Sequence, residues 1–100
     1  MAVWLLLIPL LTLRIYPLVG HAPVHVTFQA DVADNVRGPI CLEVQSEDYY
    51  RQSCWPADGR QLHWEIEYVL WNPGTYHAVL KAVEGDKVSF ATPEQTVEIR

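Results

Sequence analysis

The chain has 100 residues, half of them hydrophobic, and twelve Asp and Glu residues against seven Lys and Arg residues give it a net charge of −5. This length allows one domain at most. The acidic balance and the lack of a polybasic cluster exclude the basic surface of a nucleic-acid-binding protein and a charge-driven attraction to anionic lipid.

An apolar run from Ala2 to Leu13, with Thr12 as its one polar residue, lies near the start of the chain. It has the length of a signal-peptide core and is shorter than the roughly 20 residues that span a bilayer, which favours a cleaved signal peptide. The candidate cleavage site, Gly20-His21-Ala22, is followed by Pro23, which disfavours cleavage. Arg14, whose side chain could reach the membrane interface, fits a retained single-pass membrane anchor. Both alternatives predict an apolar N-terminal helix within residues 1–22, followed by an exported domain over residues 23–100.

Apolar residues alternate with polar ones over residues 24–29 and again over residues 40–45. A period of two with one apolar face predicts a β-strand in each segment. Residues 31–39 are rich in Asp, Asn, Gly and Pro, and this composition predicts a loop. A third, less regular strand is predicted from Tyr49 to Trp55.

Cys41 and Cys54 are the two cysteines of the chain. If Glu47 and Asp48 form a two-residue hairpin loop, the antiparallel register places the cysteines directly opposite each other, at a separation that suits a disulfide. The bond would stabilise the hairpin and would suit an oxidising compartment. The alternative is two separate buried thiols.

The segment from Leu62 to Val83 contains two further predicted strands, which meet at Asn72, Pro73 and Gly74. A three-residue hairpin loop with Gly74 in the left-handed conformation matches the two apolar faces and pairs Glu65 with Lys81. A last strand is predicted over residues 88–99, with a kink at residues 92–94. In the two strands predicted between Leu62 and Val83, the inward residues are predicted to be Leu62, Trp64, Ile66, Tyr68, Leu70, Tyr76, Ala78, Leu80 and Ala82.

Six or seven short strands separated by turns predict a small, all-β antiparallel sandwich. The chain resembles the immunoglobulin-like and fibronectin type III-like superfamily at two places. Trp55 follows Cys41 by fourteen residues, as the core tryptophan of that fold follows its first cysteine, and the segment from Pro73 to Tyr76 resembles its tyrosine corner. The resemblance departs at Ala78, where the family has its second cysteine. It implies that the strands flanking the corner lie in different sheets, as an alternative to the hairpin.

The sequence offers little support for catalysis or for a cofactor. His63, Glu65 and Glu67 share one face of a predicted strand, but residues two apart on a strand lie nearly 7 Å apart, which favours a solvated polar face over a metal site. No serine lies in a nucleophile elbow, and the cysteines are expected to pair with each other. We therefore expect no enzyme, metal or cofactor.

Four aromatic residues near strand ends and turns are the candidate binding residues: Trp71, Trp55, Tyr49 and Tyr50. Exposed tyrosine and tryptophan are typical of protein interfaces and of sugar-binding platforms, although Trp55 and Trp64 also suit the core. The first hypothesis is a non-enzymatic exported domain that serves as an accessory or structural subunit of an extracytoplasmic or membrane protein complex. The alternative is a small carbohydrate-binding module.

Overall fold

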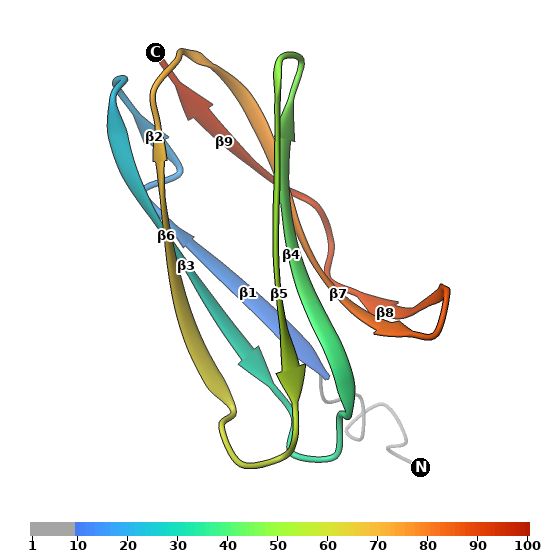
Figure 1. The fold of residues 1–100 in the computed structure, drawn as a ribbon. Coiled ribbons are helices and arrows are strands. Elements are labelled where there is room, and N and C mark those ends of the chain that lie inside the picture. The colour runs from blue at the N-terminus through green and yellow to red at the C-terminus, as the bar shows by residue number, and fades with distance from the viewer. Residues whose placement is uncertain (1–9) are drawn as a thin grey trace, which may run out of the picture.

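The computed structural model describes residues 10–100, which form nine β-strands and no helix (Figure 1). Residues 10–100 therefore include no helix with the length and hydropathy needed to cross a membrane. The strands are β1 (Leu11–Tyr16), β2 (Val19–Gly20), β3 (Val24–Val32), β4 (Gly38–Ser46), β5 (Tyr49–Ala57), β6 (His63–Leu70), β7 (Gly74–Glu84), β8 (Lys87–Ala91) and β9 (Gln95–Ile99).

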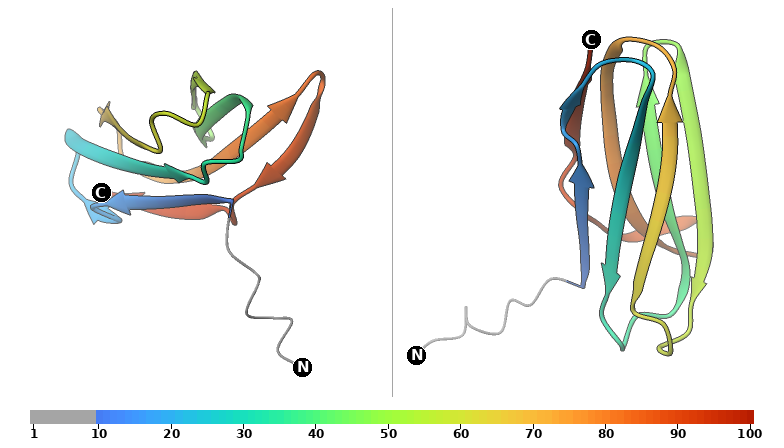
Figure 2. Two further views of the ribbon diagram at one scale, coloured as in Figure 1. Left: turned by 90° about the horizontal axis from the view of Figure 1, so that it is seen from below. Right: turned by 90° about the vertical axis from the view of Figure 1, so that its left-hand side faces the viewer.

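The strands form two sheets that pack as a sandwich (Figure 2). The first sheet has the order β1-β3-β6, and the second has the order β2-β9-β7-β4-β5, with β8 paired to β7. All pairs are antiparallel except β2 with β9. The all-β sandwich predicted from the sequence is confirmed.

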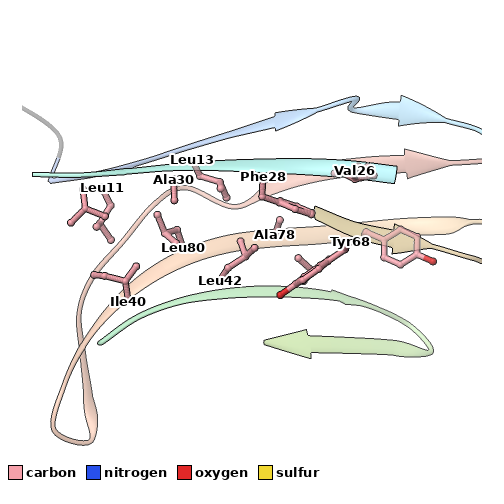
Figure 3. Close-up of a cluster of buried hydrophobic side chains, with 14 of the residues drawn as sticks. Leu11, Leu13, Val26, Phe28, Ala30, Ile40, Leu42, Tyr68, Ala78 and Leu80 are labelled. Atoms are coloured by element: carbon pink, nitrogen blue, oxygen red, sulfur yellow. The ribbon is translucent and has the colours of Figure 1, made fainter. Parts of the chain in front are cut away.

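The core lies between the sheets and includes the predicted inward residues Tyr68, Leu70, Tyr76, Ala78, Leu80 and Ala82. Leu11 and Leu13, which the sequence analysis assigned to the leader, also belong to it. In Figure 3, Leu13, Phe28 and Ala30 point from the first sheet toward Leu42 and Leu80 of the second. Most of these side chains have no exposed surface. Phe28 also lies over Ala78, so a large side chain meets a small one near the position where the resemblance expected a cysteine.

The apolar helix expected within residues 1–22 is wrong for residues 10–22, where the chain forms β1 and β2. Leu11 and Leu13 are buried in the core, while Arg14 and Tyr16 face solvent. This alternation is the pattern of a strand with one buried face. The part of the expected leader that falls on residues 1–9 lies outside the described residues.

The connection between β6 and β7 crosses from one sheet to the other, as the resemblance implied, and is not a hairpin. The predicted pair of Glu65 and Lys81 is therefore wrong. Gln29 Nε2 donates a hydrogen bond to Glu65 within the first sheet, and Lys81 Nζ lies 2.9 Å from Glu43 Oε1 in the second. Gly74 does not adopt the left-handed conformation, because it begins β7 as an extended residue.

Most of the other strand predictions are confirmed. The two-residue turn at Glu47 and Asp48 has the expected register, and the last strand is interrupted at residues 92–94, between β8 and β9. Leu62 is an exception, because it precedes β6 and has an exposed side chain. The predicted strand therefore began one residue before the observed start of β6 at His63.

The side of the sandwich between β5 and β6 is closed by side chains that reach across from one sheet to the other. Arg51 lies over the ring of Tyr68, with its Cζ 4.2 Å from the ring centroid, and the Tyr68 hydroxyl forms a hydrogen bond with Ser53 Oγ. Further along, the rings of Trp55 and Trp64 lie 5.4 Å apart. An inward-pointing charge such as Arg51 also discourages an edge strand from pairing with another chain.

Candidate protein-interaction surface

A disulfide fixes the hairpin that carries two of the candidate residues. Cys41 of β4 and Cys54 of β5 are bonded and lie directly opposite each other, as the two-residue turn predicted. Cys41 is buried, while Cys54 is exposed on the edge strand. The bond ties β5 to β4, which is its single neighbour in the sheet, and lies five residue pairs along the hairpin from the turn pair of Ser46 and Tyr49.

The tyrosine corner fixes the other loop that carries a candidate residue. Tyr76 is buried, and its hydroxyl donates a 2.6 Å hydrogen bond to the carbonyl oxygen of Asn72. Burial, with a smaller effect of Tyr49, raises the pKa of Tyr76 above its usual value. This hydrogen bond ties the start of β7 back to the connection that precedes it.

These two loops lie at the same end of the sandwich, which we call the corner end. The corner end comprises the β4–β5 turn (residues 46–49), the β6–β7 connection (residues 71–74) and the β1–β2 segment (residues 16–20), all at the upper end of Figure 1. The strand registers agree, since Val24 pairs with Leu70 and Gly74 pairs with Ile99. Segments far apart in the sequence thus share one surface.

Large exposed hydrophobic side chains gather at the corner end. Among the exposed large hydrophobic residues, Tyr16 has the highest exposed fraction, 79%, and Trp71 follows with 70%. The described residues include eight exposed large hydrophobic side chains. Four of them lie at the corner end (Tyr16, Leu18, Val19 and Trp71), and Tyr50 comes directly after its β4–β5 turn. Exposed aromatic residues in such numbers are typical of a protein interface.

Trp55 lies away from the other candidate residues. Its ring packs against Trp64 at the start of β6, whereas Trp71 follows the end of β6. Seven residues of strand separate Trp64 from Trp71, about 23 Å at the rise of a β-strand. Trp55 is half-buried and serves the closure between the sheets. Tyr49, Tyr50 and Trp71 therefore lie toward the corner end of the sandwich, whereas Trp55 lies toward the other end, so a sugar-binding platform built from all four is not assembled.

The spacing between Cys41 and Trp55 equals the spacing in the immunoglobulin-like family, but Trp55 occupies a different place in this structure. Cys41 lies on β4 and Trp55 pairs with Ile40 on the adjacent strand, so the two residues belong to one hairpin at the sheet edge. Trp55 is consequently not the central tryptophan of the core.

The outer face of the first sheet differs from the corner end, because paired polar side chains cover it. His25 Nδ1 lies 3.0 Å from Glu67 Oε1, and His63 Nδ1 lies 2.8 Å from Asp31 Oδ1. Among residues 10–100, no group of three or more His, Cys, Asp or Glu side chains is placed to hold a metal ion. This face is a solvated surface with local ion pairs, each of small energetic value.

Sequence reasoning missed three of the exposed hydrophobic residues, Tyr16, Leu18 and Val19, because it assigned them to the leader. The signal that locates Tyr16 is the alternation of residues 11–16, in which Leu11, Leu13 and Ile15 are more buried than their neighbours. The apolar run that precedes this segment obscured the alternation.

Comparison with known proteins supports the fold and adds no relative by sequence. No known protein family matches the chain, and neither does any curated protein sequence. A solved structure of CHIR-AB1 superposes with a TM-score of 0.58 at 15% sequence identity, over 93% of this chain and 100% of that chain. The chain therefore has the immunoglobulin-like fold that its sequence resembled.

Proposed function

We propose that this chain is a non-enzymatic interaction domain that binds a protein partner through the corner end. The observation that carries the proposal is the presence of exposed aromatic and aliphatic side chains there, among them Trp71 with 70% of its surface exposed. Tryptophan and tyrosine are enriched among the residues that contribute most to binding energy. The Tyr76 hydrogen bond braces the β6–β7 connection, and the ring contact between Tyr49 and Tyr76 braces the β4–β5 turn, so little ordering cost is expected on binding.

We place this interaction outside the cytoplasm, as an accessory or structural subunit of a larger extracytoplasmic or membrane complex. The disulfide supports this placement, because such bonds persist in oxidising compartments. The immunoglobulin-like fold is compatible with it but carries no function by itself.

Site-specific photocrosslinking in cells that export the full chain tests the proposal. A photoreactive residue in place of Trp71 or Tyr50 is expected to give the same discrete high-mass adduct. Val88 supplies the matched control, since it is 52% exposed at the opposite end. The same adduct from position 88, or no adduct from position 71, would contradict the proposal.

Tryptophan fluorescence distinguishes the carbohydrate-binding alternative from the proposed protein-binding function. Stacking of a sugar ring on Trp71 would change its emission, because the indole is exposed to water in the free protein. Under the proposed protein-binding function, a panel of glycans is expected to leave the emission unchanged, and a saturable response to one glycan would favour the alternative.

A further inference from the structure

A hollow of about 420 Å³ opens at the corner end, between the β4–β5 turn and the start of β7. The two segments that line the hollow are neighbours in the sheet, because β4 pairs with β7 as far as Gln45 and His77. Beyond this pair the β4–β5 turn and the start of β7 are no longer hydrogen-bonded to each other, and the hollow lies between them. Its lining residues are Ser46, Glu47, Asp48, Tyr49, Asn72, Pro73, Gly74, Thr75, Tyr76 and His77. The volume lies within the range for ligand pockets, so the hollow has room for a partner's side chain.

The walls of the hollow are held in place by contacts inside the protein. The rings of Tyr49 and Tyr76 meet edge to face with centroids 5.4 Å apart, and the Tyr76 hydroxyl holds Asn72. The first contact joins the turn to β7, and the second joins β7 to the corner. The hollow is therefore formed before any ligand arrives, which lowers the cost of binding.

The charge of the hollow has one sign. Glu47 and Asp48 are exposed carboxylates on its wall, and none of its lining residues is Lys or Arg. His77 Nδ1 lies 3.1 Å from Glu94 Oε1, so that imidazole already has an acidic neighbour. The net charge of −5 for the whole chain adds to this negative potential. An anionic ligand would meet repulsion here, whereas a cation would be attracted.

The lining also offers more than charge. Tyr49 supplies an aromatic ring, which attracts a guanidinium or an ammonium group and contacts the alkyl part of such a side chain. Carboxylates accept charge-assisted hydrogen bonds from these groups. We propose that the hollow receives a Lys or Arg side chain of the protein partner, with Glu47 and Asp48 pairing its charge and Tyr49 contacting its stem. This inference rests on the proposed protein-binding function.

Titration of the full chain with N-acetyl-arginine amide, followed by NMR of backbone amides, tests the inference. Shifts are expected at residues 46–49 and 72–77, and they are expected to be at least fivefold smaller with the neutral analogue N-acetyl-citrulline amide. The Glu47→Gln, Asp48→Asn double variant is expected to weaken arginine binding at least fivefold. A double variant of the outer face of the first sheet, Glu65→Gln, Glu67→Gln, changes the net charge equally and is expected to bind as the parent does.

Three results would overturn the cation assignment: equal shifts with citrulline, shifts scattered over the surface, or equal weakening by both double variants. The photocrosslinking result separates this inference from the proposed function. An intact Trp71 adduct without arginine-dependent shifts overturns the cation assignment alone, whereas arginine-dependent shifts without any adduct overturn the protein partner.

Discussion

Tyr76 shows how far a local motif predicts a single side chain. The segment from Pro73 to Tyr76 resembles a tyrosine corner, and the hydroxyl does bond back to the backbone at Asn72. The motif is local, so the five residues from Asn72 to Tyr76 contain the whole geometry. Trp55 could not be placed in the same way, because its contacts lie with Trp64 on a strand of the other sheet.

Removal of the Tyr76 hydroxyl is expected to destabilise the fold without changing it. Tyr76→Phe keeps the ring against Tyr49 and loses the bond to Asn72, so the free energy of unfolding is expected to fall by about 0.5–1.5 kcal/mol. Urea denaturation measures this change. Tyr50→Phe is the control, since Tyr50 is exposed and its change is expected to stay within about 0.5 kcal/mol. Equal effects of the two variants would contradict the corner's role.

The same hydroxyl predicts a loss of stability at alkaline pH. Burial raises the pKa of Tyr76 in the folded state above its unfolded value, so folding favours the protonated phenol. That contribution is fully present below the unfolded pKa of about 10 and is lost as pH rises through the raised folded pKa. The stability difference between the parent and Tyr76→Phe is expected to shrink over this range. Urea denaturation from pH 8 to 11 checks the trend, and a constant difference would contradict it.

At the scale of strands, the sequence predicts which face of a strand is buried better than it predicts which strand pairs with it. Alternation identifies the buried face of β3, β4, β6 and β7, because each strand has a period of two. It does not identify which strand lies alongside. The residues flanking the corner have the same inward face in a hairpin as in a crossing between sheets, so the error at Glu65 and Lys81 is one of pairing alone.

The β4–β5 hairpin is the element whose pairing the sequence did predict. A two-residue turn leaves a single register, and that register brings Cys41 to Cys54. Short-range pairing of this kind is determined by the turn, whereas the pairs β3–β6 and β4–β7 join residues that are 32 to 46 positions apart in the chain.

Loss of the disulfide is expected to destabilise the domain substantially. The double variant Cys41→Ser, Cys54→Ser opens a loop of about fourteen residues, which corresponds to about 3 kcal/mol in the chain-entropy account. Urea denaturation measures the change, and the parent protein under reducing conditions is expected to unfold at the same midpoint as the variant. A change below about 1 kcal/mol would contradict the stabilising role of the bond.

At the scale of the whole molecule, the N-terminal segment is where sequence reasoning and structure differ most. Composition marks residues 1–22 as a leader, because the apolar run continues into Leu13. The structure places residues 11–20 in strands of both sheets, with β1 on β3 and β2 on β9. Gln95 Nε2 also donates a hydrogen bond to the carbonyl oxygen of Leu13. This segment therefore joins the two sheets.

A chain that begins at Pro23 is therefore expected to fold poorly. It lacks Leu11 and Leu13, both buried, and truncation of one buried leucine to alanine already costs about 2–5 kcal/mol. The loss of both side chains amounts to about 4 kcal/mol or more, a large share of the 5–15 kcal/mol typical of a folded domain. It also leaves β3 as an unpaired edge.

Circular dichroism and urea denaturation of three chains check this expectation. The chain from Pro23 is expected to lose its cooperative transition, whereas a control that begins at Leu10 keeps β1 and β2 and is expected to unfold like the full chain. Equal midpoints for the chains from Leu10 and Pro23 would show that β1 and β2 contribute little. If the expectation holds, removal of residues 1–22 by a signal peptidase would also remove two strands of the fold, and the native protein is expected to retain residues 11–22 by mass spectrometry.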